Sequence, residues 1–256
     1  MSWGSDLPLY ALQARLLELY RADRAEEIGF WAWLAGDYGL RVVDWAAGAG
    51  EIACGLAARG FQVTGVERRP EWLALAEERA EALPPEARPR WVEGEVTATR
   101  LRDRFDFALL TDDAFGRLPD AEARRQALRT IFLHLRPGGG MALVLTPPPL
   151  LPVDEGLHPV PRLRPLPDGV QVERFRRYRY EEDIRRLFVE EVLEVREGGH
   201  TRRVQWRYEV QLFTPDAIFR LLRIVGFTAI GLFGGWDGRP WRPGSPAWIV
   251  RAERPL

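Results

Sequence analysis

A glycine-rich segment early in the chain has the composition of a ligand-binding turn. Residues 42–50 read VVDWAAGAG, with Asp44 at the end of a short apolar run and Gly48 and Gly50 just before a helical pattern. Glycine at a strand-to-helix turn lets the backbone come close to a ligand, and the first N–H groups of the following helix attract a carboxylate or a phosphate. The segment therefore predicts a cofactor-type site.

Two glutamates stand where they could complete such a site. Glu67 ends the second predicted strand, where a carboxylate accepts hydrogen bonds from two ribose hydroxyls. Glu95 follows the third predicted strand, where a carboxylate can accept from an exocyclic amine such as that of adenine. Either acid alone is typical of a solvated surface. In register with the glycine turn, they indicate a nucleoside site.

Alternating strands and helices must position these groups. The pattern predicts five strands, at residues 40–45, 61–67, 90–95, 104–111 and 141–145. Helices are predicted between them, at residues 51–59, 71–82 and 121–135, and one or two more precede the first strand, over residues 7–34. This alternation predicts βαβ units with right-handed crossovers, and hence a doubly wound, Rossmann-like α/β sheet that is mostly parallel.

The second half of the chain follows a different pattern. A proline-rich loop runs to Pro167, and polar–apolar alternation then predicts antiparallel strands, at residues 170–180, 184–195 and 202–213. Thr214 as cap and Pro215 as first helical residue predict a helix that ends at Gly226. Two closing strands follow, at residues 228–233 and 247–252. We expect residues 147–213 to be an inserted antiparallel cover over the active-site end of a domain built from residues 1–146 and 214–256.

Several motifs in a fixed order resemble those of class I S-adenosylmethionine-dependent methyltransferases. The likeness is to the small-molecule branch that includes glycine N-methyltransferase-like enzymes. Asp44, Gly48 and Gly50 match an acid followed by alternating glycines, and Ala46 departs from the family glycine at its position. Four further segments resemble the family's later motifs, at residues 66–73, 93–96, 105–116 and 135–139.

The resemblance implies a seven-stranded sheet, S-adenosylmethionine as cofactor, S-adenosylhomocysteine as product and a small-molecule methyl acceptor. It also implies a set of cofactor-binding residues, namely Asp44, Ala46, Gly48, Gly50, Glu67, Arg68, Glu95, Val96 and Thr111. The N-terminal helices, with Tyr20, Trp31 and Trp33, resemble the family's lid over the cofactor. Ordinary aromatic core is the alternative interpretation of these three side chains.

Methyl transfer from a sulfonium is an in-line displacement, so alignment and exclusion of water are the main tasks of the enzyme. A general base is needed only where the acceptor arrives protonated. The candidates are Asp112, Asp113, Tyr208 and Tyr20, and the two aspartates would equally suit a cap on the following turn.

The insert is rich in arginine and aromatic residues, at 174–180 and 202–208. One interpretation is a surface for an acidic small acceptor or for RNA. The other is an amphipathic sheet whose arginines pair with the acids that lie between them, such as Glu190 and Glu194. A nucleic-acid surface should carry mainly one sign of charge, so the interleaved acids favour the second interpretation.

Composition narrows the class of protein. The 256 residues fit one domain or a domain with an insertion, 46% are hydrophobic and 29% charged, and the formal net charge is -1. This charge gives no reason to expect nucleic acid or an anionic membrane as the main partner, and a homodimer is compatible with it. A single cysteine, Cys54, and three scattered histidines argue against a metal site. No apolar run reaches ~18 residues and no signal peptide is recognisable, so we expect a cytoplasmic protein.

Three other functions compete with small-molecule methyl transfer. Residues 48–53 fit the G-x-G-x-x-A fingerprint of an NAD(P)-binding oxidoreductase, with Glu67 near the ribose position. An RNA methyltransferase is disfavoured, because no Asn/Asp-Pro-Pro-aromatic step follows the fourth strand and the chain has no second cysteine. A protein that binds S-adenosylmethionine without turnover is the third alternative, and Ala46 and the two glutamates are the features that favour it.

Overall fold

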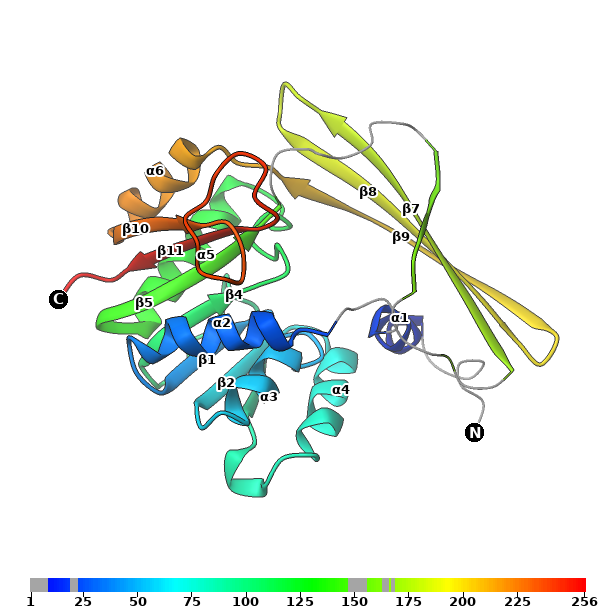
Figure 1. Ribbon diagram of the computed structural model, residues 1–256, viewed down its shortest axis with the longest axis horizontal. Helices are drawn as coiled ribbons and strands as arrows, with labels where there is room; N and C mark the ends of the chain where they lie inside the picture. Colours follow the sequence, from blue (N-terminus) through cyan, green and yellow to red (C-terminus); the bar gives the residue numbers. More distant parts are fainter. Residues whose placement is uncertain (1–8, 19–22, 147–155, 163–165, 167–168) are drawn as a thin grey trace. The chain divides into compact units, whose positions relative to one another are not determined.

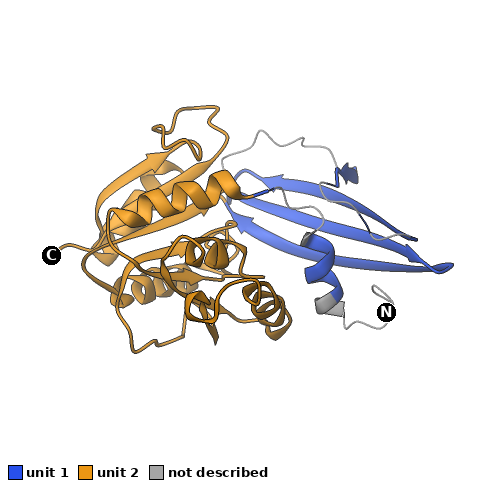
Figure 2. Cartoon of the chain, turned by 60° about the horizontal axis from the view of Figure 1, so that its bottom comes forward, with its two compact units in different colours: residues 1–23, 149–211 blue, residues 24–148, 212–256 orange. Residues whose placement is uncertain are grey.

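The computed structural model describes residues 9–18, 23–146, 156–162, 166 and 169–256. The chain forms two compact units (Figure 2). Unit 1 comprises residues 1–23 and 149–211, and unit 2 comprises residues 24–148 and 212–256. Each unit has hydrophobic clusters of its own. Within the described parts of the chain, every helix is too short or too polar to traverse a bilayer.

Unit 2 contains the predicted doubly wound sheet of seven strands (Figure 1). Its strand order is β10-β11-β5-β4-β1-β2-β3, in which β1 runs parallel to β2 and β4, and β11 runs antiparallel to β5 and β10. The strands are β1 Arg41–Trp45, β2 Gln62–Glu67, β3 Arg90–Glu93, β4 Phe105–Leu110, β5 Leu135–Leu145, β10 Thr228–Phe233 and β11 Trp248–Glu253. The fold class inferred from the sequence is thus confirmed.

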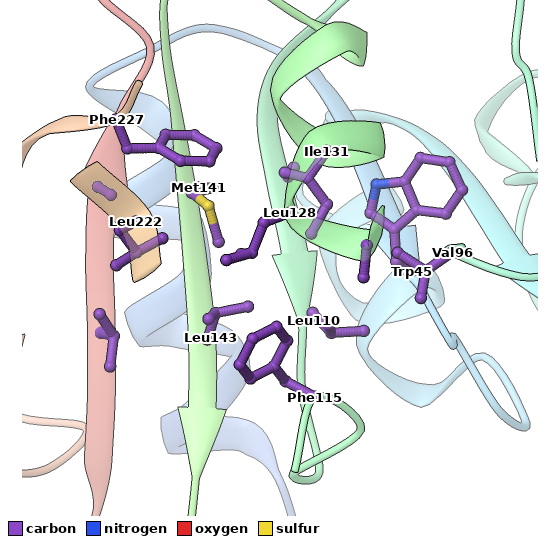
Figure 3. Packing of buried hydrophobic residues seen from close by; sticks show 14 of the residues in the cluster. Trp45, Val96, Leu110, Phe115, Leu128, Ile131, Met141, Leu143, Leu222 and Phe227 are labelled. Carbon is purple, nitrogen blue, oxygen red and sulfur yellow. The ribbon is translucent and has the colours of Figure 1, made fainter. Parts of the chain in front are cut away.

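Helices cover both faces of this sheet because alternate strand residues point to opposite sides. Val42 and Leu109 belong to the cluster beneath α2 and α3, whereas Val43 and Leu110 belong to the cluster beneath α5 and α6. Figure 3 shows the second cluster, with Leu128 and Ile131 of α5 and Leu222 of α6 against the strands. The helices of unit 2 are α2 Ala25–Gly36, α3 Glu51–Ala57, α4 Pro70–Ala80, α5 Ala121–His134 and α6 Pro215–Val225, with a 3-10 turn at Pro85–Ala87.

Local chemistry sets the ends of these elements. The Thr214 hydroxyl accepts a hydrogen bond from the Ala217 N–H at 3.2 Å, and α6 ends at Gly226 with φ +112°, as expected. The start of β5 differs from the expectation of a turn over residues 136–140. Gly138 and Gly139 instead exchange backbone hydrogen bonds with Arg254, and Leu135 pairs with Phe105 of β4 across a register shift, so the strand begins at Leu135.

Unit 1 holds a four-stranded antiparallel sheet in the order β6-β7-β8-β9. Its elements are α1 Leu9–Glu18, β6 His158–Val160, β7 Val170–Glu181, β8 Arg186–Glu197 and β9 His200–Gln211. The three long strands confirm the predicted antiparallel pattern, with ends shifted by a few residues. Gly198 and Gly199 both have positive φ, at +56° and +80°, and form a two-residue hairpin turn.

One end of the sheet in unit 1 forms a small apolar core. Leu12 and Leu16 of α1 share this cluster with Val170 and Val172 of β7, Val195 of β8 and Val204 of β9. The helix is amphipathic in the way that the spacing of its leucines predicts.

Candidate functional site

Every second residue of the glycine turn between β1 and α3 has a left-handed backbone. Ala46, Gly48 and Gly50 have φ values of +58°, +57° and +75°. A Cβ at Gly50 would lie 2.6 Å from the Trp91 ring, so this position has no room for a side chain. A Cβ at Gly48 would only touch Trp72, at 3.7 Å, so the positive φ is what favours glycine there.

Glu67 joins this turn to the start of α4. Its buried carboxylate accepts hydrogen bonds from the backbone N–H groups of Gly48 at 3.0 Å, Arg68 at 2.9 Å and Arg69 at 3.0 Å. A carboxylate has about four acceptor positions, so these three donors leave room for a further one. The structure therefore brings Glu67 and the glycine turn together, as the sequence predicts.

Glu95 and Arg68 lie side by side at the carboxyl ends of β3 and β2. Arg68 Nη1 is 3.4 Å from Glu95 Oε1, and both side chains are exposed. Val96 is buried in the cluster beneath α5 and α6. Thr111, which follows β4, is buried too, and its carbonyl oxygen accepts from the Ala114 N–H at 3.0 Å. All these residues follow the carboxyl ends of neighbouring parallel strands, where ligands bind in open α/β sheets.

Asp44 is the most deeply buried acid of this edge. Its side chain is enclosed at the end of β1, and Oδ1 has no hydrogen-bond partner among the described residues. The pKa of Asp44 is raised to about 8, chiefly by burial, while the charge of Arg24 opposes the rise. The carboxylates of Asp112, Glu27 and Glu67 contribute to the same rise.

Arg24, just before α2, is a central residue that sequence reasoning missed. Its guanidinium is nearly buried and bonds two acids: Nε lies 2.8 Å from Glu27 Oε2, and Nη1 lies 3.0 Å from Asp112 Oδ2. Burial works against its charge, but the neighbouring acids raise the pKa of Arg24 above its ordinary value. Trp31 Nε1 donates to Glu27 at 3.1 Å, which completes the cluster. Helical spacing of Arg24, Glu27 and Trp31 was the available signal.

Asp112 and Asp113 have different surroundings although both adopt φ +54°. Asp112 is half-exposed and bonds Arg24 through both of its oxygens. Asp113 is buried and accepts from the backbone N–H groups of Gly116 at 3.2 Å and Thr146 at 3.0 Å. Burial raises the pKa of Asp113 to about 6, while the hydrogen bond from Thr146 opposes the rise. Asp113 thus ties the loop after β4 to the end of β5.

The aromatic side chains proposed for the lid or as a base have different surroundings in the structure. Trp31 is fully buried in the cluster beneath α2 and α3, whereas Trp33 is half-exposed. Tyr20 lies outside the described residues. Tyr208 belongs to unit 1, where its hydroxyl donates to Glu191 Oε1 at 3.1 Å. Arg174, also in unit 1, holds the same carboxylate at 2.7 Å.

Most arginines of unit 1 that had suggested an anionic partner are paired with acids. Glu190 lies 2.8 Å from Arg207 and 3.5 Å from Arg177. Arg174 and Arg176 both pair with Glu191, each at 2.7 Å. These pairs fit the amphipathic-sheet interpretation better than a surface of one sign.

Known proteins share this arrangement. A family model described as a methyltransferase domain matches residues 42–139, which contain the glycine turn, Glu67, Glu95 and the loop after β4. These residues are therefore similar in sequence to a methyltransferase domain.

Solved structures of methyltransferases resemble nearly the whole chain, not only residues 42–139. The CcbJ methyltransferase from Streptomyces caelestis is 19% identical, with a TM-score of 0.75 over 92% of this chain and 91% of that one. The sugar N-methyltransferase KedS8 from Streptoalloteichus is 19% identical, with a TM-score of 0.75 over 100% and 97%. The amino pentose methyltransferase CalS10 from Micromonospora echinaspora, solved with S-adenosylmethionine bound, is 23% identical, with a TM-score of 0.71 over 98% and 99%. At these identities the likeness establishes the fold.

Two curated relatives match by sequence. A demethylmenaquinone methyltransferase of Thermus thermophilus is 32% identical over 149 residues, which are 56% of this chain and 63% of that protein. The protein YqeM of Bacillus subtilis is 28% identical over 99 residues, 39% of each chain. The matches therefore span less than two thirds of either relative.

Proposed function

We propose that the protein transfers the methyl group of S-adenosylmethionine to a small-molecule acceptor by in-line displacement. The observation that carries this proposal is the edge of the sheet where the buried Oδ1 of Asp44, which has no partner in the described parts of the chain, adjoins the glycine turn and Glu67. A buried acceptor atom without a donor is costly, and a ligand that supplies a donor removes the cost. The ammonium group of a methionine moiety is such a donor.

The residues present fit the rest of the cofactor. Glu67 and Glu95 would accept from the ribose hydroxyls and the adenine amine, and Arg24 would attract the methionine carboxylate. The remaining contacts are assigned to the turn and the strand ends, at Asp44, Ala46, Gly48, Gly50, Arg68, Val96 and Thr111. When bound, the cofactor supplies a methyl group activated on a sulfonium sulfur. The protein's part is to orient the two reactants and exclude water.

A small acceptor is supported by two observations. Two structural neighbours with TM-scores above 0.7 act, by their names, on a sugar and an amino pentose. The paired arginines of unit 1 do not form the one-signed surface that RNA requires. Asp113 is engaged by two backbone N–H groups and holds the loop, so we propose an acceptor whose nucleophilic atom arrives without a proton to remove.

Calorimetric titration with S-adenosylhomocysteine tests the proposal, with NADH as the competing ligand. We expect micromolar binding of S-adenosylhomocysteine and at least a ~30-fold loss in Glu67→Ala, which removes the acceptor of three backbone bonds. Glu93→Ala is the matched control. Glu93 is an exposed acid on β3, and its Cα lies opposite that of Glu67 on β2. Binding of NADH alone would support an oxidoreductase instead.

A turnover assay separates an enzyme from a binding protein. Labelled S-adenosylmethionine is incubated with the protein and a panel of amino sugars, other small amines and phenols, with RNA as the contrasting acceptor. Transfer to a small molecule supports the proposal. Transfer to RNA alone would overturn its acceptor class.

A further inference from the structure

The last strand of the sheet in unit 1 has a long, regular outer edge. Among the described strands, β9 pairs with β8 alone, and its 12 residues run in unbroken register with that strand. Its sequence, HTRRVQWRYEVQ, contains no proline or glycine that would interrupt the strand. An edge of this kind is a template for pairing with a further strand.

The other sheet edges that the described strands form are blunted. β6 has three residues and includes Pro159, and β3 has four residues. β10 has a register shift against β11, and Ala229 within it adopts φ +47°. Short strands, proline and irregular backbone are the usual means by which proteins prevent pairing at an edge. Of the edges that the structure describes, β9 is the one without such protection.

The backbone of β9 can offer hydrogen bonds to a partner strand. The Gly198–Gly199 turn closes on the pair of Glu197 and His200, and hydrogen-bonded pairs recur at every second residue from there. The N–H and C=O groups of the odd-numbered residues therefore point away from β8. Those of residues 203, 205, 207 and 209 form no hydrogen bond with any residue that the structure describes. The side chains of these residues are exposed.

The charges along this edge favour a second copy of the chain as the partner. Arg203 is exposed and has no acidic partner in the described parts of the chain. Glu209 pairs with Arg186 at 2.9 Å and is 53% exposed, so its carboxylate has lone pairs left for a second guanidinium. An arginine in one half of a strand and a glutamate in the other half become complementary when two identical strands pair antiparallel.

Charge also selects the register of such a pair. In a two-fold symmetric pairing, one residue lies opposite its own copy, and opposed side chains share a face of the sheet. Two registers then pair nearly the whole strand, one centred on Gln205 and the other on Trp206. The first places Arg203 opposite Arg207 of the second copy, and opposed like charges are destabilising. The second places Arg203 opposite Glu209 of the second copy, twice in each dimer.

We propose that two copies of the chain pair antiparallel along β9, with Trp206 opposite its own copy, so that their antiparallel sheets join into one. This inference is independent of the proposed function. Residues 203–209 of the two copies would exchange roughly eight backbone hydrogen bonds, within the ~10 ± 5 of a typical interface. Trp206 packs against the apolar cluster of unit 1, and its ring gains an aromatic neighbour across the new pair of strands.

Gln205→Pro tests whether the backbone edge is used. Proline removes an N–H that would donate to Arg207 of the second copy, and its ring obstructs the approach of that strand. The same N–H points away from β8, which is a place where an edge strand tolerates proline. Sedimentation equilibrium of the full chain should show a dimer for the wild type, and a dissociation constant raised at least ~30-fold for this variant.

Charge reversal tests the register. Arg203→Glu and Glu209→Arg each convert two opposite-charge pairs into two like-charge pairs, and each should raise the dissociation constant at least ~10-fold. An equal mixture of the two variants should recover the wild-type value as a heterodimer, because each chain then carries the charge that the other needs. Arg220→Glu is the matched control. Arg220 is likewise exposed and has no acidic partner among the described residues, but it lies on α6, and its reversal should leave the dimer unchanged.

Three outcomes would overturn the inference. They are a wild type that stays monomeric up to ~100 μM, a folded Gln205→Pro protein that dimerises as the wild type does, and a mixture of the two reversal variants that dimerises no better than either alone. Circular dichroism checks that each variant is folded. The reversal variants leave the backbone of β9 unaltered, so they decide the question even where Gln205→Pro does not fold.

Discussion

Two carboxylates, one in each unit, are equally buried and have opposite surroundings. Glu191 in unit 1 and Asp44 in unit 2 are each 1% exposed. Burial would raise the pKa of Glu191, but the guanidiniums of Arg174 and Arg176 overcome this and lower it. The pKa of Asp44 is raised to about 8 by the same burial, because its one basic neighbour is shared with other acids. Burial alone therefore does not decide whether a carboxylate is ionised. The balance of partners decides it.

The comparison separates an acid that builds structure from one that is ready for a ligand. Glu191 receives hydrogen bonds from Arg174 at 2.7 Å and 2.9 Å, from Arg176 at 2.9 Å and from Tyr208 at 3.1 Å. Nothing more is needed to satisfy it. Asp44 has an oxygen without a partner among the described residues, at the edge of the sheet where the other proposed cofactor residues lie. The following predictions test this distinction.

The largest expected effect is on the stability of unit 1. Glu191→Ala leaves two largely buried guanidiniums without their shared carboxylate, and we expect it to lower the free energy of unfolding by about 3–5 kcal/mol. Urea unfolding followed by circular dichroism measures the change. Glu194→Ala on the same strand removes a more exposed acid that pairs with Arg196 at 3.4 Å, and it should cost under about 1 kcal/mol. Equal costs for the two variants would contradict the structural role of Glu191.

The second effect is a dependence of stability on pH that has opposite signs for the two acids. The pKa of Asp44 is raised in the folded state, so its contribution to stability is fully present below about pH 4 and is lost as the pH rises toward 8. Asp44→Asn should remove this decline, which amounts to about 2 kcal/mol between pH 6 and pH 8. Urea unfolding at pH 6, 7 and 8 measures it.

Glu191 supplies the contrast. Its pKa is lowered in the folded state, so its contribution is present above about pH 4 and is lost as the pH falls below that value. Wild-type and Asp44→Asn proteins with parallel stability curves between pH 6 and pH 8 would show that Asp44 is ionised throughout, and the distinction between the two acids would fail.

The sequence predicts the features whose causes are local. The glycine turn, the Thr214 cap and the Gly198–Gly199 hairpin depend on residues within a few positions of one another, and the structure has all three. The alternation of apolar runs predicts the order of strands and helices. The start of β5 was wrongly expected as a turn, because Gly138 and Gly139 are paired by Arg254 more than a hundred residues later.

The candidate site is partly hidden from the sequence for the same reason. Arg24 and Glu27 form an i,i+3 pair that is typical of an exposed helix end. The hydrogen bond from Arg24 to Asp112, 88 residues further along the chain, is a tertiary contact that this spacing does not reveal. Asp113 and Asp112 are adjacent in sequence, yet Asp113 contacts Thr146 and Asp112 contacts Arg24, each far away along the chain. Sequence spacing identifies which residue types could act, and tertiary contacts decide which of them are already engaged.

The smallest expected effect concerns Ala46, the position at which the chain departs from the family's glycine. Ala46 adopts φ +58°, and a left-handed alanine costs roughly 1–2 kcal/mol. Glycine would relieve this strain, but it would lose more conformational entropy on folding, which offsets part of the gain. The side chain of Ala46 is exposed, so little packing is lost on removing it. Ala46→Gly should therefore raise the free energy of unfolding by about 0.5–1 kcal/mol.

The neighbouring Ala47 provides the matched control, because it does not adopt a positive φ. Ala47→Gly should lower the free energy of unfolding by about 0.5–1 kcal/mol, since glycine gains only unfolded-state freedom there. Urea unfolding of both variants measures the two changes, which must differ in sign if backbone strain is stored at Ala46. A destabilised Ala46→Gly protein would mean that the alanine methyl group stabilises the turn, and that this departure from the family pattern is favourable for the fold. Strain at a site where Asp44 Oδ1 has no partner among the described residues would be further evidence that unit 2 has given up stability at its proposed cofactor site.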